Sequence, residues 1–500
     1  MNDEQALARL IEGESTETNL ADLVMRQAET QPDGVALVQP RPSRRTMTWA
    51  ELARRVGAIA AGLSAHGLLA GQRIAIFGPN SIEFVVAYLA TLRAGYVAVP
   101  INPDSTVTEL RRMIKDCGAR VLFTAADQPL DSLHQIALTP EAFDELSEAA
   151  VQPVNSPRDP EALAVLLYTA GTSGEPKAAM LSHRALLSHV HNVASLDIVG
   201  REDVVLAILP LFHVFGLNAV LGNCLISGAR LVIMDGFDGL AEVLAAEKIT
   251  NLPVAPLMLA RILDDERAIA SLGSVTRVIS GAAPLSVDLR EEFTARTGVT
   301  VDQGYGLTEA APGVTATLGN GAVGHGHVGR PLPGVEIRIG DGTEPTEPGE
   351  IWVRGANLFS GYWPEGREGP DADGWFATGD IGYMINDDLF LVDRSRELII
   401  VNGFNVYPAE VEEAIAELPE VEAVAVVGRP HWRTGEQVEA FVAGTGPTVS
   451  AIDQHCANRL ARFKRPSLVR VVRELPRGIT GKVKKGVLRQ SLDSADEAAP

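Results

Sequence analysis

The segment from Leu166 to His183, LLYTAGTSGEPKAAMLSH, has the residue types of a loop that binds phosphate. An apolar strand is expected to run into small and hydroxyl residues, and a helix is expected after Lys177. Small residues let backbone N–H groups approach an anion, hydroxyl groups add donors, and the lysine adds a positive charge. A Walker loop is excluded, because Pro176 and Ala178 stand where its lysine needs a preceding glycine and a following serine or threonine. The pattern favours phosphate binding over a glycine- and serine-rich surface loop.

Other segments carry charged and hydroxyl residues with complementary chemistry. In GYGLTEA, the hydroxyl of Thr308 could hold a phosphate oxygen, and the carboxylate of Glu309 could hold Mg²⁺ that bridges phosphates. Asp380 in ATGD is suited to accept hydrogen bonds from both hydroxyls of a ribose. Lys482 in TGK, a glycine-flanked segment, could supply a point cation beside phosphate groups. Taken alone, the Thr-Glu pair would more often be a helix cap, and the other two residues solvated surface groups.

In this order the segments resemble the motifs of the adenylate-forming enzymes, which include acyl-CoA synthetases, luciferases and the adenylation domains of peptide synthetases. YTAGTSGEPK resembles their phosphate loop, and LPLFHVFG, from Leu209 to Gly216, resembles the segment that lines the acyl site. The resemblance continues through ISGAAPLS, QGYGLTEA, GRPLPG, GEIWVRG, DGWFATGD, DRSRELIIVNGFNVYPAEVE and PRGITGKVKK, so it covers most of the chain. The chain is identified as a member of this family, of the acyl-CoA synthetase or fatty-acid–CoA ligase type. The resemblance implies ATP, Mg²⁺ and coenzyme A as cofactors.

The resemblance also implies a role for individual residues. It makes Lys482, Thr308 and Glu309 catalytic, with Glu309 as the metal ligand. It implies ATP or AMP binding by Thr169, Gly171, Thr172, Ser173, Gly174, Lys177, Gly281, Ala282, Ala283, Gln303, Gly304, Tyr305, Gly306, Asp380 and Arg394. It implies acyl binding by His213, Val214, Phe215, Gly216, Ala282 and Gly306, and pantetheine binding by Asn402, Gly403 and Phe404.

The chain departs from the family pattern at several positions. Ala170 replaces the usual serine, and Ser173 replaces threonine but keeps the hydroxyl. Ala178 replaces a glycine, which we expect to stiffen the loop. Arg396 in DRSRE occupies the hinge position, where lysine or aspartate is typical. His213 lies among apolar residues, where a histidine is most often a satisfied core residue. The resemblance instead implies a gate or substrate contact, not a proton shuttle.

The alternation of apolar strands and helices predicts the fold that positions these motifs. A helix is expected from the N-cap residue Thr48 to a glycine stop at Gly67, and short β-branched strands follow. Strands alternate with helices again over 204–235 and 249–283. This alternation is typical of wound α/β sheets.

Glycine and proline punctuate the sequence more often after about residue 320. Short alternating runs such as VEIRIGDG and GEIWVRG favour hairpins and a small β-barrel-like subdomain over residues 320–394. A compact α+β unit, resembling a cap, is expected beyond the DRSRE junction. We therefore predict an α/β protein with an N-terminal adenylation domain, residues 1–394, and a mobile C-terminal domain, residues 395–500.

The candidate acyl segments indicate the class of acid. LPLFHVFGLNAV contains no carboxylate for a substrate ammonium group, and QGYGLTEAAPG contains no arginine for a second carboxylate. Apolar residues suit an alkyl chain or an aromatic ring, held by burial at roughly 0.8 kcal/mol per CH₂. We predict ATP-dependent activation of a medium- or long-chain fatty acid to acyl-AMP, with release of pyrophosphate, followed by thioester formation with CoA. The alternatives are an aryl-CoA ligase, a ligase that acylates holo-acyl carrier protein, and a degenerate adenylate-binding protein without catalysis.

The composition of the chain restricts the cellular compartment and the classes of partner that we expect. The 500 residues include 43 Lys and Arg against 64 Asp and Glu, a net charge of −21 that opposes binding to nucleic acid or anionic membrane. The three cysteines are far apart, which fits a reducing compartment. The longest apolar stretch, Phe84 to Leu92, is shorter than the ~20 residues of a membrane span. We expect a cytoplasmic enzyme without stable membrane insertion or a nucleic-acid partner, and a homodimer is compatible with the sequence.

Overall fold

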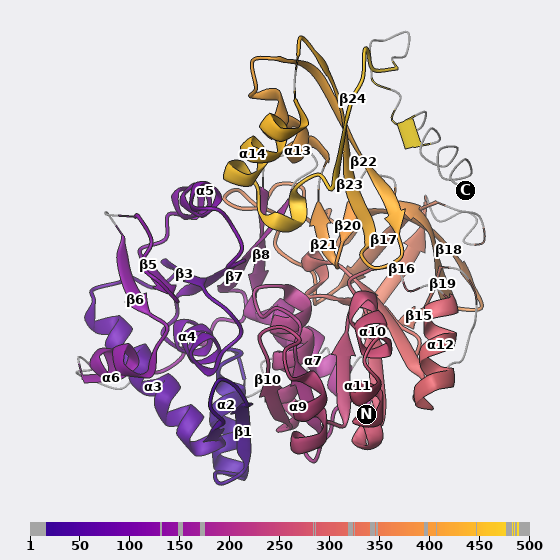
Figure 1. Ribbon diagram of the computed structural model, residues 1–500. Helices are drawn as coiled ribbons and strands as arrows, with labels where there is room; N and C mark the ends of the chain where they lie inside the picture. Colours follow the sequence, from indigo (N-terminus) through magenta and orange to yellow (C-terminus); the bar gives the residue numbers. More distant parts are fainter. Residues whose placement is uncertain are drawn as a thin grey trace.

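The protein is a mixed α/β structure with a large N-terminal domain and a small C-terminal domain (Figure 1). The computed structural model describes residues 17–476, except 131–132, 149–153, 171–175, 284, 286, 319–323, 325, 341–345, 347–348, 395–398, 407 and 447. Beyond them it describes residues 483, 485, 488 and 489. The described strands form three sheets. Strands and helices alternate along much of the large domain, as expected from the sequence.

The first sheet has six strands and is parallel except at one edge. Its order is β6 (His134–Ala137), β5 (Val121–Thr124), β3 (Arg73–Phe77), β4 (Val97–Ile101), β7 (Leu163–Ala170) and β8 (Pro176–Ser182). Only β7 and β8 run antiparallel, with Thr169 paired to Lys177. Thr169 and Lys177, two of the residues expected to bind phosphate, therefore lie at one end of this hairpin.

The second sheet is a hydrogen-bonded path of thirteen strands. Its order is β16 (Val335–Ile339), β17 (Gly349–Gly355), β18 (Trp375–Ile385), β19 (Asp388–Arg394), β15 (His327–Pro331), β14 (Gly313–Ala316), β13 (Val301–Gly306), β12 (Arg277–Ser280), β11 (Asn251–Val254), β9 (Val204–Ala207), β10 (Arg230–Ile233), β1 (Val35–Gln39) and β2 (Arg45–Thr48). The strands from β13 to β1 are parallel, whereas those from β14 to β16 are antiparallel. The change of texture expected near residue 320 thus corresponds to a change from parallel to antiparallel pairing.

Helices of the large domain cover these sheets and fill the space between them (Figure 1). They are α2 (Asp22–Thr30), α3 (Trp49–Ala65), α4 (Ile82–Arg93), α5 (Val107–Cys117), α6 (Pro140–Glu148), α7 (His183–Ala194), α8 (Asn223–Ser227), α9 (Leu240–Glu247), α10 (Pro256–Leu263), α11 (Glu266–Ala270) and α12 (Val287–Thr297). The largest hydrophobic cluster draws on both sheets, because residues such as Phe84, Tyr88 and Leu187 are fully buried between them. Because the two sheets share this core, the predicted site motifs that they carry are held in fixed positions relative to one another.

Two helices begin with the same capping arrangement. Thr48 caps α3 as predicted, and Thr106 caps α5. In each case the threonine hydroxyl accepts from the backbone N–H three residues on, and the carboxylate of Glu51 or Glu109 accepts from the threonine N–H. Such a box satisfies two backbone donors that the first helical turn leaves unpaired.

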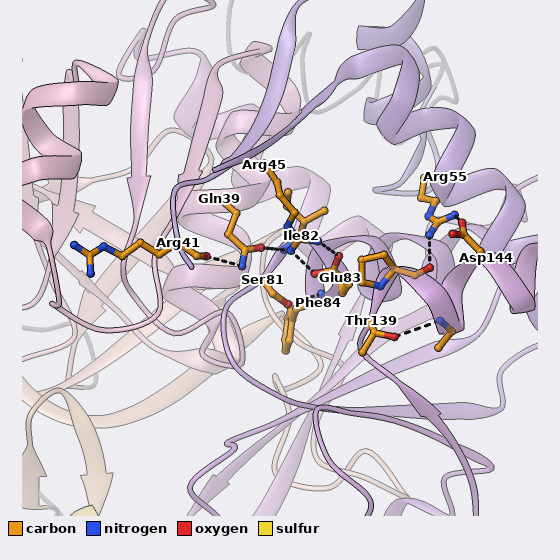
Figure 2. Close-up of polar contacts among 12 residues, drawn as sticks. Gln39, Arg41, Arg45, Arg55, Ser81, Ile82, Glu83, Phe84, Thr139 and Asp144 are labelled. Carbon is orange, nitrogen blue, oxygen red and sulfur yellow. Dashed lines mark hydrogen bonds and ion pairs between the residues drawn. The ribbon is translucent and has the colours of Figure 1, made fainter. Parts of the chain in front are cut away.

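A partly buried ion pair joins strand β2 of the second sheet to helix α4 (Figure 2). Arg45 on β2 donates to both oxygens of Glu83 on α4, at 2.6 and 2.8 Å. Gln39 on β1 links the same elements, because its side-chain oxygen accepts from Arg45 and from the N–H of Ile82. Ser81 caps α4 beside this contact. Bidentate geometry of this kind fixes the angle between two elements better than a single contact does.

The third sheet belongs to the C-terminal domain, at the top of Figure 1. It consists of β21 (Phe404–Val406), β20 (Ile399–Val401), β23 (Gly435–Gly444) and β22 (Val421–His431), with β24 (Leu468–Val471) parallel to β23. The helices α13 (Pro408–Ala416) and α14 (Val449–Arg459) pack on one face through their own hydrophobic cluster. A separate cluster forms around Ala425, Val427 and Phe441 on β22 and β23. The domain thus has a core of its own.

Candidate functional site

The predicted phosphate segment is a hairpin, not a strand followed directly by a helix. Strand β8 lies between the loop and α7 and pairs with β7 along most of its length. The expectation of a helix after Lys177 is therefore wrong, because Ala178 and Ala179 are buried as strand residues. The helix-dipole argument for anion binding does not apply here. Gly171, Thr172, Ser173 and Gly174 lie outside the described residues, whereas Thr169 and Lys177 face each other across the hairpin.

Lys177 and Glu309 both lie next to the side chain of Tyr362. Glu309 lies in the short helix η3 (Thr308–Ala310), directly after β13, so Thr308 is beside it. The hydroxyl of Tyr362 donates to Glu309 Oε1, and Lys177 Nζ lies 5.3 Å from the centroid of the Tyr362 ring. Lys177 also contacts Glu368 at 2.5 Å. The sequence motifs do not indicate Tyr362, whose one signal is an aromatic residue in the polar segment SGYWPEG.

Two buried asparagines hold the chain that follows Glu309. Asn357 donates through Nδ2 to the carbonyl oxygen of Ala310 at 2.7 Å, and Asn218 donates to that of Ala311 at 2.7 Å. The N–H of Phe359 donates to the carbonyl oxygen of Glu309 itself. Hydrogen bonds from buried amide groups to backbone carbonyl oxygens restrict a loop to few conformations. The carboxylate of Glu309 is therefore presented from a constrained backbone.

The predicted ribose carboxylate also has a partner. The hydroxyl of Tyr305 on β13 donates to Asp380 Oδ2 at 2.7 Å, so two nucleotide-binding candidates from different motifs are in contact. Asp380 on β18 stands opposite Arg394 in the strand register. The strands β13, β15, β18 and β19 all lie within the second sheet. Strand pairing in this sheet thus brings together Tyr305 and Asp380, which are far apart in the chain.

The predicted adenine-side turn follows β12. Gly281 is buried, and a Cβ atom there would lie 2.9 Å from Cε1 of Phe215. Ala282 has a positive φ of 67°, and Ala283 follows it in the same turn. Gln303 and Gly304 lie on the neighbouring strand β13. Two of these motifs therefore lie side by side at the ends of parallel strands, where ligands commonly bind in α/β sheets.

The predicted acyl segment leads into a π-helix, η1 (Phe215–Gly222). Val214 and Gly216 are buried, and Gly216 has no room for a side chain because a Cβ atom would lie 2.3 Å from the carbonyl oxygen of Pro210. Phe215 reaches Gly281 of the adenine-side turn. At Gly306, a Cβ atom would lie 2.2 Å from the carbonyl oxygen of Pro312. π-helices are rare and often occur at functional sites.

His213 lies at the start of this segment. Its Nδ1 accepts from the N–H of Phe215 at 3.2 Å. Desolvation lowers the pKa of His213 to about 4, although the residue keeps some solvent contact. The imidazole is therefore neutral near pH 7, which agrees with a contact residue better than with a proton shuttle.

Burial of a second histidine predicts sensitivity to acid. His189 on α7 accepts from the N–H of Gly313, and burial lowers its pKa to about 3 from the ordinary 6.5. Between these values the unfolded chain binds a proton that the folded chain excludes, so stability falls as pH falls from about 6.5, by up to about 1.4 kcal/mol per pH unit. We expect His189→Gln to reduce the fall in Tm between pH 7 and pH 5. His66→Gln, an exposed control, should leave that fall unchanged, and an unaltered fall in His189→Gln would contradict the prediction.

The predicted pantetheine residues form the tip of a hairpin. Asn402 and Gly403, with φ of 53° and 82°, join β20 to β21, as Asn-Gly does in tight hairpins. A Cβ atom at Gly403 would lie 3.7 Å from the Cβ atoms of both Ala255 and Ala282. The tip of the C-terminal hairpin thus touches the adenine-side turn of the large domain.

An aromatic stack lies beside this contact. The ring of Phe404 is stacked on that of Phe212, next to His213, with centroids 6.0 Å apart. Phe463 packs on Phe404 with centroids 4.6 Å apart. The candidate pantetheine and acyl segments are therefore neighbours in this structure.

Two further predicted residues, Lys482 and Arg396, also lie outside the described residues. Next to the first, Val483 packs into the cluster formed by Ala425, Val427 and Phe441. Among the described residues no group of three or more His, Cys, Asp or Glu side chains could hold a metal. A single carboxylate such as Glu309 nevertheless fits Mg²⁺, because this ion is usually held by one or two carboxylates together with substrate phosphates. No described helix has both the length and the apolarity to cross a membrane.

Comparison with known proteins covers both domains. The AMP-binding enzyme family matches residues 24–363, and the AMP-binding enzyme C-terminal domain matches residues 410–482. A feruloyl-CoA synthase from Amycolatopsis sp is 35% identical over 93% of this chain and 97% of its own length. A long-chain-fatty-acid–CoA ligase from Bacillus subtilis is 32% identical over 85% of this chain and 86% of its own length.

Solved structures agree with this result. The o-succinylbenzoate CoA synthetase from Bacillus subtilis, bound to its product analogue, has a TM-score of 0.84 and 29% identity, over 94% of this chain and 98% of that one. Both family matches are to AMP-binding enzymes, both relatives are named as CoA synthase or CoA ligase, and the solved structure shares the fold of this chain. The chain therefore belongs to the adenylate-forming family of AMP-binding enzymes and is an ATP-dependent, AMP-forming acid–CoA ligase.

Proposed function

We propose that the chain converts a medium- or long-chain fatty acid to its CoA thioester in two steps at one site. The observation that carries this proposal is the contact of the Gly403 hairpin with Ala282, which brings the candidate pantetheine segment to the candidate acyl and adenine segments. Residues 1–394 would supply the nucleotide and acyl site. Residues 395–500 would move about Arg396 between the steps. We place the reaction in the cytoplasm, where ATP and CoA are available.

In the first step, a carboxylate oxygen of the acid attacks the α-phosphorus of ATP. The bond from that phosphorus to the β-bridging oxygen breaks, and pyrophosphate leaves with the electron pair. Lys177 and Thr308 would hold phosphate oxygens, and Lys482 would neutralise the approach of two anions. Mg²⁺ on Glu309 would supply charge neutralisation for the phosphates when bound. Tyr362 supports this assignment, because its hydroxyl orients the Glu309 carboxylate.

In the second step, the thiol sulfur of the acceptor attacks the acyl carbonyl carbon and the thiol proton is released to solvent. The bond from that carbon to the phosphate oxygen breaks, and AMP leaves with the electron pair. Asn402 supports binding of the pantetheine arm, because its side-chain oxygen is buried without a hydrogen-bond partner among the described residues. That oxygen would accept from an amide N–H of the arm. The 3′-phosphate of CoA would meet cations near the hairpin, where Arg433, Arg462 and Arg465 are candidates. Arg429 is a further candidate of the same kind.

The nature of the acid is the finer part of the proposal. The described wall residues Val214, Phe215 and Ala282 are apolar, which suits an alkyl chain. The aromatic ring of Phe215 over Gly281, and the 35% identity to a feruloyl-CoA synthase, favour an aryl acid as the second candidate. Parallel assays with decanoate, palmitate and ferulate, each with ATP and CoA, separate the two by mass spectrometry of the thioester. Turnover of ferulate alone would overturn the fatty-acid assignment.

The acceptor and catalysis itself need a separate experiment. Pyrophosphate release with acid and ATP, followed by product analysis with either CoA or holo-acyl carrier protein, tests both. A carrier-only product would overturn the CoA assignment. Binding of AMP without pyrophosphate release from any acid would indicate the degenerate adenylate-binding alternative.

Removal of the metal carboxylate should weaken the first step through Mg²⁺. We expect Glu309→Ala to raise the Mg²⁺ concentration for half-maximal pyrophosphate release by roughly tenfold or more, because the other ligands would come from the substrate alone. Glu161→Ala, which removes an exposed carboxylate paired with Arg184, is the control. The measurement is pyrophosphate release across a Mg²⁺ titration. An unchanged midpoint in Glu309→Ala would refute the assignment.

A further inference from the structure

A group of alternating charges, three of them largely buried and Arg112 half exposed, joins α5 of the large domain to the C-terminal domain. Lys464 Nζ donates to Glu410 Oε1 at 2.8 Å and to Glu109 Oε1 at 3.2 Å. Arg112, one turn after Glu109 on α5, lies 3.7 Å from the same oxygen of Glu410. Only 14% of the Lys464 side chain and 5% of the Glu109 side chain are exposed. Two of these residues belong to α5, and the other two belong to the C-terminal domain.

The charge of Lys464 is maintained at this interface. Desolvation by burial acts to lower the pKa of Lys464, but the attraction of Glu410 and Glu109 and their hydrogen bonds outweigh it, so the pKa is raised. A buried ammonium group that loses one of two carboxylates is strongly disfavoured, because desolvation is no longer offset. Glu109 therefore stabilises the contact between α5 and the C-terminal domain.

Glu109 uses its two oxygens for two different purposes. Oε2 accepts from the N–H and the hydroxyl of Thr106 and completes the capping box of α5. Oε1 accepts from Lys464 and, at 3.4 Å, from the backbone N–H of Ala461. Glu51, in the other capping box, makes the same contact with Thr48 at the same 2.8 Å but lies on an exposed surface. The sequence motif is the same, and only one of the two carboxylates reaches the other domain.

We propose that Glu109 is a positioning residue for thioester formation: it holds the C-terminal domain in the orientation that places the Gly403 hairpin against Ala282. This inference rests on the two-step function proposed above. Glu109 acts through Lys464 and the backbone of Ala461, and none of its described contacts is with a candidate catalytic residue. Any movement of the C-terminal domain away from α5 would separate Lys464 from Glu109 while leaving the Lys464–Glu410 contact intact, because both of those residues move together.

The test compares Glu109→Gln with Glu51→Gln, since glutamine can still complete a capping box. Each variant is assayed for ATP–pyrophosphate exchange with decanoate and, separately, for consumption of synthetic decanoyl-AMP in the presence of CoA. We expect Glu109→Gln to slow the second reaction by about tenfold, mainly through a higher apparent KM for CoA, because the competent orientation is populated less. Exchange should stay within about twofold of the wild type. Glu51→Gln should be normal in both assays and should have a Tm close to that of Glu109→Gln.

The outcomes separate this inference from the function on which it rests. If the wild-type protein exchanges pyrophosphate and consumes decanoyl-AMP, the two-step function stands. If the Glu109→Gln variant then loses both activities equally, or loses neither of them, the positioning role of Glu109 is overturned. A wild-type protein that is inactive in both assays with every acid tested would instead overturn the proposed function. A similar loss in Glu51→Gln would show that capping, not domain contact, is responsible, and would also overturn the inference.

Discussion

Lys482→Ala is expected to reduce acyl-AMP formation by about a hundredfold or more, while thioester formation from supplied acyl-AMP and CoA largely survives. The first step brings a carboxylate towards a polyanionic triphosphate, and an aimed cation at that point is worth roughly 10²–10³ in rate when removed. The second step has no such encounter, because pyrophosphate has left and the attacking thiol carries little charge. The same substitution should therefore affect the two halves very differently.

The measurement is each half-reaction alone: ATP–pyrophosphate exchange for the first, and consumption of synthetic acyl-AMP for the second. Lys485→Ala is a matched control, since it removes a lysine three residues away that pairs with Glu412 of α13. We expect this control to change stability and to leave the ratio of the two rates unaltered. Equal loss of both reactions in Lys482→Ala would show that the lysine has another function.

Local chemistry explains why much of the fold was predictable. The N-cap at Thr48, for example, depends on residues within a few positions of it. The change to antiparallel strands near residue 320 follows from glycine, proline and alternation in the same way. The helix expected after Lys177 failed because two short apolar runs, β7 and β8, can pair as a hairpin, and periodicity alone cannot distinguish a short buried strand from a helix.

The sequence pattern could not predict the long-range contacts that organise the site. Tyr362 meets Glu309 from a segment 53 positions away, and Lys464 meets Glu109 across 355 positions. A tyrosine and a capping glutamate each have an ordinary local explanation, so nothing in their neighbourhood indicates a distant partner. The motifs indicated which residue types could carry the chemistry. Their arrangement depends on strand order and on domain contact.

Gly403→Leu should have the opposite effect to Lys482→Ala. Gly403 has a φ of 82°, which leucine rarely adopts, and its Cβ would already be in van der Waals contact with Ala255 and Ala282 at 3.7 Å. The remaining atoms of leucine would extend into the space between the hairpin and the large domain. We therefore expect thioester formation from acyl-AMP to fall by about a hundredfold. Adenylation should be nearly intact.

Backbone strain and obstruction can be separated within the same domain. Gly446 also has a positive φ, of 85°, but a Cβ atom there would meet nothing within 4 Å. Gly446→Leu thus imposes comparable strain without filling the space at the Gly403 hairpin, and we expect both half-reactions to survive in it. If Gly403→Leu and Gly446→Leu lose thioester formation to the same extent, strain in the domain is the cause and the assignment of Gly403 to pantetheine binding is wrong. If only Gly403→Leu loses thioester formation, and pyrophosphate exchange persists in it, the defects of Gly403→Leu and Lys482→Ala are opposite. Opposite defects require two arrangements of the site, because in one rigid arrangement each residue would affect both reactions.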